Sequence, residues 1–348
     1  MYEEYYGFTE KPFSLTPDPR FLFPSETHAG AFELLEYAMR RREGFVVITG
    51  DIGTGKTTLC RALLERLDQQ TFSALLLNPF LSEVDLLKLI LQDFGVVSRD
   101  ELHHGEMSQV SKQALIDTLN DFLLSLLPLG AGAMLIVDEA QNLPPQVLEQ
   151  IRILSNLETD KEKLLQIVLV GQTDLDRTLR APGLRQLAQR VSIAHELEPL
   201  TRDEVAAYVL HRLTVAGGGS SVVFRPAAID AVHRLSGGTP RVINLLCDRA
   251  LLAGCAARTN IIEAELVTTA SESLELPRAA GKAPSIGGRV RRRVAALATA
   301  VGLTALVATV GLGYLVSQGF RVTRTEQFPM FVVERSVTAP LSAPTTTP

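Results

Sequence analysis

Eight residues between positions 50 and 57 have the types and the spacing of a phosphate-binding loop. They read G-x-x-x-x-G-K-T and end in Lys56 and Thr57. The glycines let backbone N–H groups curl round a triphosphate, the lysine reaches the β- and γ-phosphates, and the threonine hydroxyl faces Mg²⁺. The residues expected to contact the nucleotide are Gly50, Asp51, Ile52, Gly53, Thr54, Gly55, Lys56, Thr57 and Thr58.

The sequence on either side of this loop fits the same interpretation. Residues 45–49 form an apolar run that indicates a buried strand, and residues 57–67 follow as a helix whose N-terminus would face the anion. A glycine-rich turn in some other α/β protein is the alternative, but it would not need the Lys-Thr pair. The sequence therefore predicts a site for ATP and Mg²⁺.

Two adjacent carboxylates supply what hydrolysis needs beyond binding. Asp138 and Glu139 follow the apolar run 134–137, so they would lie at the carboxyl edge of a buried strand, where ligands bind in open α/β sheets. Asp138 would hold Mg²⁺ directly or through water, and Glu139 would polarise the attacking water as general base. The alternative is an exposed acidic turn. With the loop upstream, the pair predicts an ATPase that converts ATP and water to ADP and phosphate.

Four further residues are candidates for three roles at the γ-phosphate. Gln172 follows the predicted strand 165–170, where its amide could orient water in the sensor-1 role or simply sit in a turn. Arg241 opens a helix of the second domain and could reach back as sensor 2, or it could be structural. Either Arg185 or Arg190 could act on a neighbouring subunit as an arginine finger, although a solvated helix face explains both equally well.

These residues need a scaffold, and the chain alternates strands with helices up to Pro199. The alternation predicts an α/β fold of the P-loop NTPase kind, a parallel sheet with helices on both faces. Beyond Pro199 only helices are expected, which predicts an all-α lid domain. The expected strands are 45–49, 72–77, 134–137, 165–170 and, more weakly, 190–194; the expected helices are 57–67, 82–94, 109–127, 145–157, 226–236, 240–257 and 263–274.

The domain boundaries follow from changes in composition. Residues 1–24 are rich in Phe, Tyr and Pro, so we expect an extended segment that packs on a core. The remaining predicted parts are the α/β nucleotide-binding domain at 25–199, the lid at 200–276, a basic linker at 277–293, a transmembrane helix at 294–316 and a short periplasmic tail at 317–348 that we expect to be disordered.

The predicted membrane helix rests on charge and length. Residues 294–316 contain no charged side chain, and as a helix they would span about 34 Å, enough for a hydrocarbon core of about 30 Å. Four arginines precede this run, so the positive-inside rule would keep the ATPase domain in the cytoplasm. A buried Ala/Val-rich helix is the alternative, which the basic cluster and the length disfavour.

Charge and cysteine content indicate what kinds of partner and environment to expect. The chain has 348 residues and a formal net charge of −5, which gives no overall attraction to nucleic acid but leaves room for a local basic patch. The three cysteines have no metal-binding spacing and no disulfide framework, so we expect reduced thiols. The length suggests two or so domains.

The motifs, in this order, resemble those of AAA+ ATPases. The runs YYGFTEKPF at 5–13, TPDP at 16–19 and DEAQ at 138–141 narrow the resemblance to the ExeA/GspA type, general secretion pathway protein A, over about residues 1–275. The resemblance implies a single-pass ATPase of the bacterial inner membrane that helps to assemble secretion, pilus or exopolysaccharide machinery. It assigns the Walker A role to Lys56 and Thr57 and the Walker B role to Asp138 and Glu139. It assigns the sensor-1 role to Gln172 and the sensor-2 role to Arg241.

Further expectations concern partners. We expect a homo-oligomer with ATP sites between subunits and a membrane-embedded partner of envelope assembly. The ExeA type carries a periplasmic peptidoglycan-binding domain, for which residues 317–348 are too short, so wall binding by this chain is not expected. A DNA-acting ATPase of the transposition-accessory kind is the alternative function, and a nucleotide-dependent scaffold with little turnover is a third.

Overall fold

The computed structural model describes most of the first 274 residues and two short segments near the other end. The chain divides into two compact units, residues 1–279 and 280–348, and each is considered by itself. The described residues are 2–68, 70–77, 81–104, 110–160, 162–218, 221–274, 320–324 and 331–335.

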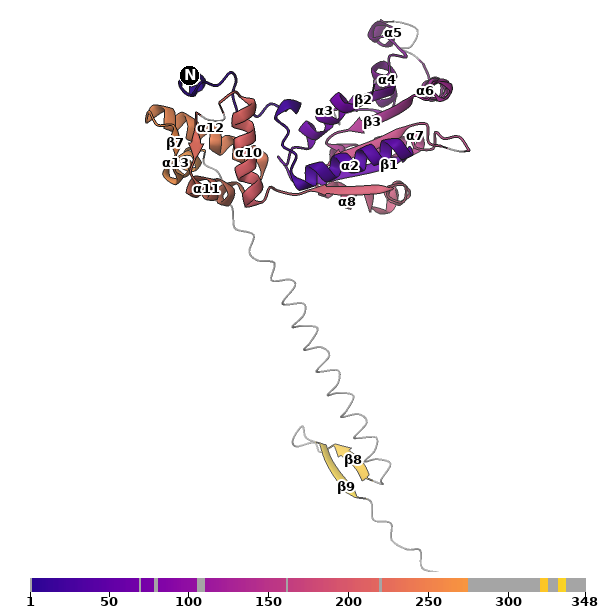
Figure 1. The fold of residues 1–348 in the computed structure, drawn as a ribbon. Helices are drawn as coiled ribbons and strands as arrows, with labels where there is room; N and C mark the ends of the chain where they lie inside the picture. Colours follow the sequence, from indigo (N-terminus) through magenta and orange to yellow (C-terminus); the bar gives the residue numbers. More distant parts are fainter. Residues whose placement is uncertain are drawn as a thin grey trace, which may run out of the picture. The chain divides into compact units, whose positions relative to one another are not determined.

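A five-stranded parallel sheet forms the centre of the first unit (Figure 1). Its order is β2-β3-β4-β1-β5, so the strand before the phosphate-binding loop is flanked by β4 and β5. Because all strands run the same way, the loops that follow β1, β3 and β4 meet at one edge. The strands are β1 (Phe45–Gly50), β2 (Thr71–Leu76), β3 (Gly132–Val137), β4 (Gln166–Gly171) and β5 (Ile193–Leu197).

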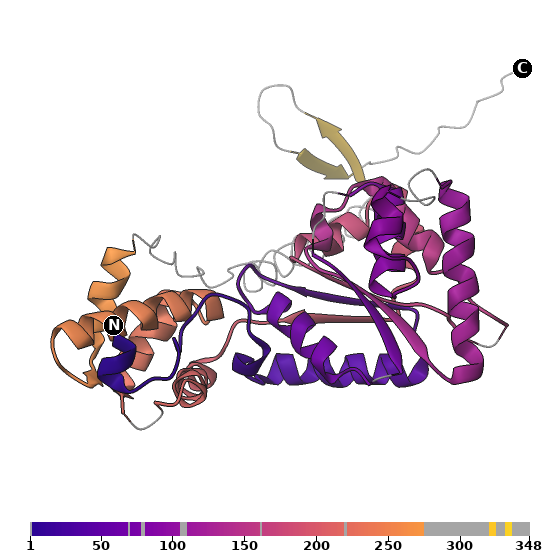
Figure 2. The same ribbon diagram turned by 90° about the horizontal axis from the view of Figure 1, so that it is seen from above.

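Helices cover both faces of this sheet, as predicted (Figure 2). Alternate residues of β1 point to opposite faces, so Val46 and Ile48 pack with α2 and α3, whereas Phe45 and Val47 pack with α4, α6 and α7. The helices are α2 (Glu26–Arg41), α3 (Lys56–Arg66), α4 (Glu83–Asp93), α5 (Arg99–His104), α6 (Lys112–Leu126), α7 (Pro145–Leu154), α8 (Asp174–Leu179) and α9 (Arg185–Ala188).

The lid is a helical bundle with one small addition. It comprises α10 (Arg202–Val215), α11 (Pro226–Ser236), α12 (Pro240–Ala256) and α13 (Ala264–Ser273). Thr201 and Glu204 form the capping box that opens α10. The expectation of an all-α lid is wrong in one detail, because β6 (Val223–Phe224) and β7 (Ile261–Ile262) pair in parallel. Two-residue strands are too short to leave a period in the sequence.

The N-terminal segment packs on a core, as expected, and the core is that of the lid. The side chains of Tyr2, Tyr6, Phe8, Phe13 and Phe21 are buried among lid residues. The segment is not wholly extended, because it begins with helix α1 (Tyr2–Tyr6) and contains the 3₁₀ turn η1 (Pro19–Phe21). Short 3₁₀ turns also occur at η3 (Leu127–Leu129), η4 (Ala140–Asn142) and η5 (Pro182–Leu184).

The last strand of the sheet begins later than predicted. We expected it at 190–194, but β5 occupies Ile193–Leu197. The backbone N–H groups of Arg190 and Val191 donate to Leu187 and Ala188, so they close the turn after α9 and cannot join the sheet. The turn after α9 therefore occupies the first residues of the predicted strand, and the sequence pattern did not reveal this turn.

Predictions for the second unit have mixed outcomes. The strands β8 (Phe320–Arg324) and β9 (Phe331–Arg335) pair in antiparallel fashion, so the expectation of disorder is wrong for these two segments. Both are rich in aromatic and β-branched residues, which favour strands. Both the predicted linker 277–293 and the predicted membrane helix 294–316 lie outside the described residues. No helix among the residues that are described has the length and apolar character to cross a membrane.

Candidate active site

The predicted phosphate-binding loop joins β1 to α3 and has the backbone shape that its glycines allow. Gly53 and Gly55 adopt positive φ angles of 84° and 103°. A Cβ atom at Gly53 would lie 2.7 Å from the Cβ of Arg241, and one at Gly50 would lie 2.9 Å from the Leu197 carbonyl oxygen. Only glycine fits these positions without a shift, which leaves the backbone free to approach a phosphate closely.

Lys56 is the first residue of α3 and is 5% exposed. Its Nζ donates to the carbonyl oxygens of Gly50 and Asp51 at 3.0 and 2.9 Å, so the ammonium is held along the loop. Burial lowers the pKa of Lys56, and the carboxylates of Glu139 and Asp138 oppose that shift. The helix N-terminus and this ammonium together favour an anion at the loop.

Asp138 connects β3 to the phosphate-binding loop. The Thr57 hydroxyl donates to its Oδ2 at 2.6 Å, and the backbone N–H of Glu139 donates to its Oδ1 at 2.9 Å. Asp138 is 2% exposed, and burial raises its pKa, while the bond from Thr57 acts to lower it. A hydroxyl and a carboxylate oxygen in contact are hard oxygen ligands, and this donor set fits Mg²⁺.

Glu139 has an unusual backbone conformation directly after strand β3 and the residue Asp138. Its φ of 52° and ψ of 36° lie in the left-handed region, which is uncommon for a residue with a Cβ. Its Oε2 accepts a hydrogen bond from Nε2 of Gln141 at 2.6 Å. Gln141 in turn accepts from the backbone N–H of Gln172 at 2.9 Å. Gln172 thus contributes its backbone N–H to this network, whereas the sequence predicted a role for its side-chain amide.

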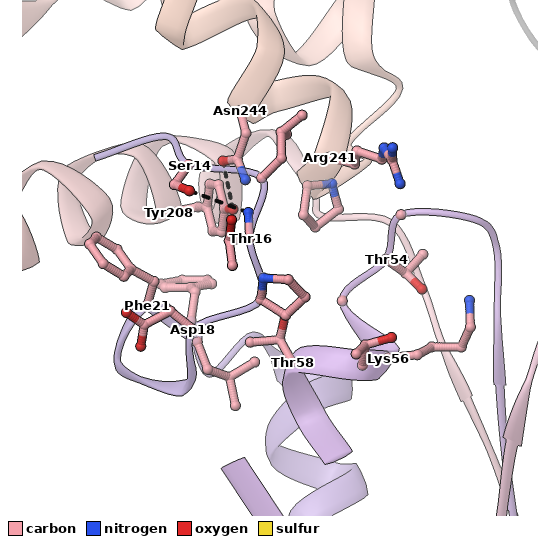
Figure 3. Close-up of a pocket in the computed structure, with 18 of the residues that line it drawn as sticks. Ser14, Thr16, Asp18, Phe21, Thr54, Lys56, Thr58, Tyr208, Arg241 and Asn244 are labelled. Atoms are coloured by element: carbon pink, nitrogen blue, oxygen red, sulfur yellow. Dashed lines mark hydrogen bonds between the residues drawn. The ribbon is translucent and has the colours of Figure 1, made fainter. Parts of the chain in front are cut away.

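A pocket lies beside the loop, between the sheet domain, the lid and the N-terminal segment (Figure 3). Figure 3 shows Lys56 and Thr58 on one side and Tyr208 and Asn244 of the lid on the other. The pocket contains every predicted loop residue from Ile52 to Thr58, together with Glu139 and Arg241. Gly50, Asp51, Asp138, Gln172 and Arg190 do not line it.

Arg241 brings the lid into contact with the phosphate-binding loop. Its backbone N–H donates to the carbonyl oxygen of Gly53 at 3.1 Å, and its side chain lines the pocket. The second residue of α12 is therefore fixed to the loop by its main chain while its guanidinium remains exposed. This placement is compatible with the predicted sensor-2 role.

The two candidate finger arginines differ in their environments. Nη1 of Arg190 donates to the carbonyl and hydroxyl oxygens of Ser155 at 3.2 and 3.0 Å, so this guanidinium holds the end of α7 in its own chain. Arg185, the first residue of α9, is exposed. The structure thus distinguishes two residues that the sequence could not separate.

Sequence reasoning missed the residues that hold the N-terminal strap, which we define as residues 12–18. Arg212 of α10 donates to the carbonyl oxygens of Pro12 and Ser14 at 2.5 and 3.0 Å, and Arg61 of α3 donates to that of Pro17 at 2.8 Å. Strap residues 14–18 line the pocket. The aromatic content had indicated packing here, but no local signal indicated that the strap would reach a ligand site.

A buried histidine is hydrogen-bonded to the backbone of the phosphate-binding loop. His28 is 3% exposed, and its Nε2 lies 3.1 Å from the carbonyl oxygen of Thr54 while its Nδ1 lies 2.7 Å from the Ser25 hydroxyl. Since a carbonyl can only accept, Nε2 carries the proton and Nδ1 accepts from Ser25. Burial lowers the pKa of His28, which keeps the ring neutral.

Fold and site together define a P-loop nucleotide-binding protein with a helical lid. A family model described as an AAA domain matches residues 39–179. General secretion pathway protein A of Aeromonas hydrophila is 47% identical over 256 residues, which are 74% of this chain and 45% of that protein. The chain belongs to the AAA+ ATPases of the general secretion pathway protein A type.

A second curated relative is more distant in sequence. The Holliday junction branch migration complex subunit RuvB of Prosthecochloris aestuarii (strain DSM 271 / SK 413) is 25% identical over 225 residues, covering 61% of this chain and 60% of that protein. The chain therefore spans about half the length of the curated relatives it matches.

Solved structures give the same picture of the fold. The Aeropyrum pernix ORC2 protein, in ADPNP and ADP complexes, matches with a TM-score of 0.58 and 15% identity, over 76% of this chain and 72% of that one. Cdc6p of Pyrobaculum aerophilum matches with a TM-score of 0.57 and 18% identity, over 75% and 70%.

Proposed function

We propose that this chain binds ATP with Mg²⁺ and hydrolyses it to ADP and phosphate. The observation that carries the proposal is the meeting of two distant segments, in which the Thr57 hydroxyl contacts the Asp138 carboxylate at 2.6 Å beside Lys56 and Glu139. Candidate residues for phosphate binding, metal ligation and base catalysis thus lie together at one edge of the sheet.

Each residue has a proposed task in this reaction. The loop N–H groups and Lys56 bind the phosphates, and Thr57 and Asp138 would hold Mg²⁺, which neutralises charge on the phosphate oxygens when it is bound. Glu139 takes a proton from the attacking water. Gln172 remains a sensor-1 candidate, and Arg241 contacts the γ-phosphate from the lid as sensor 2.

The binding half of this proposal is tested by Lys56→Ala. The substitution removes the buried ammonium beside the loop, so affinity for a fluorescent ATP analogue should fall by about 100-fold or more. Lys88→Ala on α4 serves as the matched control and should bind normally. Wild-type affinity in Lys56→Ala would contradict the assignment of the phosphate site.

In the cell we propose a role in envelope assembly at the bacterial inner membrane, in the secretion, pilus or exopolysaccharide class. The support is the 47% identity to general secretion pathway protein A and the apolar run 294–316 of the sequence. A detergent pull-down with Glu139→Gln and ATP should retain a membrane-embedded partner that is lost without nucleotide. We also propose a homo-oligomer with ATP sites between subunits.

The DNA-acting alternative is not favoured. RuvB is named for Holliday junction branch migration, but its identity to this chain is 25%, about half that of the secretion relative. The archaeal structures are less than 20% identical and support the fold alone. The net charge of −5 also gives no general attraction to phosphate backbones.

A further inference from the structure

We infer that Gln141 is a positioning residue for hydrolysis, which aims the Glu139 carboxylate and ties it to the tip of strand β4. This inference rests on the proposed function, because it assigns Gln141 to the same reaction. Gln141 does not line the pocket, so it acts through Glu139 and not on the nucleotide.

Two hydrogen bonds fix the side chain of Gln141. Its Nε2 donates to Oε2 of Glu139 at 2.6 Å, and its Oε1 accepts from the backbone N–H of Gln172 at 2.9 Å. A carboxylate only accepts and a backbone N–H only donates, so the two partners determine which way round the amide lies. Among the common side chains at this length, glutamine alone supplies both groups, since glutamate cannot donate when ionised.

The backbone of β4 leaves room for this bridge. A Cβ atom at Gly171, the last residue of β4, would lie 2.7 Å from Oε1 of Gln141. The amide therefore passes over a position that has no side chain. An added methyl group would displace the far end of Gln141, and the next atom of its surroundings is Leu175 Cδ2 at 2.9 Å.

The bridge has a consequence for catalysis. Glu139 has a left-handed backbone, and one oxygen of its carboxylate is held by Gln141, which leaves the other oxygen for the attacking water. Strand β4 lies between β1, which carries the phosphate-binding loop, and β3, which carries Asp138. A shift of the β4 tip would therefore move the base relative to the phosphate site, and small misplacements of this kind cost up to about 100-fold in rate.

The test compares ATP hydrolysis by the wild-type full chain and by the full chain carrying Gln141→Met. The substitution keeps the length of the side chain but removes both hydrogen bonds. We expect kcat to fall by about tenfold or more, with KM, nucleotide affinity and unfolding temperature close to wild type. The matched control is Gln146→Met, an exposed glutamine on α7, which should leave all four quantities unchanged.

A second pair of variants tests the same bridge without changing Gln141. Gly171→Ala should lower kcat in the same direction, whereas Gly132→Ala should not, because nothing lies within 4 Å of a Cβ at Gly132. If Gln141→Met is unstable, this pair decides the question. Wild-type kcat in a folded Gln141→Met would overturn the inference, and so would wild-type kcat in Gly171→Ala if Gln141→Met does not fold.

A double substitution separates this inference from the proposed function. When Glu139 has already been replaced by Gln, adding Gln141→Met should cause no further loss of rate, because the base that it positions is absent. If Glu139→Gln is inactive while Gln141→Met turns over normally, the inference fails and the function stands. If Glu139→Gln hydrolyses ATP at the wild-type rate, the assignment of Glu139 as base fails and this inference fails with it. If the wild type itself releases no phosphate from ATP, the proposed function fails.

Discussion

Single residues in this site depend on partners from outside the motifs. Lys56, Thr57, Asp138 and Glu139 could be predicted because each belongs to a short run with a fixed spacing. Gln141 could not be assigned a role, although it stands in the same turn, because one of its two partners lies 31 positions away. Contacts of that kind follow from the sheet order, which the sequence does not state.

His28 leads to a prediction about pH. Its pKa is lowered by burial, so the unfolded chain takes up a proton near pH 6.5 that the folded ring resists. The stabilising effect of the neutral ring is thus complete above about pH 6.5 and is lost as the pH falls below it. The free energy of unfolding should fall less steeply between pH 7.5 and 5 in His28→Gln than in the wild type.

The control for this prediction is His233→Gln on α11, a histidine that is only partly buried. Denaturant titrations at several pH values would provide the free energies. Equal slopes in the wild type and in His28→Gln would show that protonation of His28 does not contribute. The comparison between variants matters here, because buried carboxylates such as Asp138 also contribute to the pH dependence.

At the level of elements, strands β1 to β4 and most helices were predictable, whereas the N-terminal strap was not. The alternation of apolar runs and amphipathic helices predicts the sheet and its two covered faces. The strap has no period of its own, and arginines of two different helices determine its course, Arg212 of α10 and Arg61 of α3. It therefore links the lid to the helix that follows the phosphate-binding loop.

Arg212→Met should weaken both stability and nucleotide binding. Arg212 is 6% exposed, and the substitution leaves the carbonyls of Pro12 and Ser14 without their donor, at a cost of about 2–4 kcal/mol in the free energy of unfolding. Because strap residues line the pocket, KM for ATP should rise more than kcat changes.

The matched control is Arg249→Met, an exposed arginine on α12, which should change neither quantity. Thermal unfolding and steady-state kinetics on the same samples would provide both readouts. If Arg212→Met lost stability but retained the wild-type KM, the strap would be a structural element without a part in binding.

At the scale of the whole molecule, the first unit joins a nucleotide-binding sheet domain to a lid through the contact between Arg241 and Gly53. Through this contact, a change of nucleotide at the loop would alter the position of the lid. In the proposed oligomer, the same change would reach neighbouring subunits. The sequence indicated both domains but not which arginine a neighbour would use.

Arg185, and not Arg190, should be the residue that acts on a neighbour. Arg185→Ala should retain ATP binding and lose about 1,000-fold in kcat, whereas Arg190→Ala should mainly lower stability, because Arg190 holds Ser155. Mixing Arg185→Ala subunits with Glu139→Gln subunits should restore hydrolysis at interfaces that combine the two intact residues. A mixture as inactive as its components would rule out action between subunits.

The most direct test of the proposed ATPase mechanism is steady-state phosphate release from ATP by the wild type and by Glu139→Gln. Glu139 lines the pocket, and its carboxylate is held by Gln141, so its replacement should leave ATP affinity intact and slow phosphate release by at least about 100-fold. Phosphate release at the wild-type rate from Glu139→Gln would contradict the central claim that this residue is the base of an ATPase.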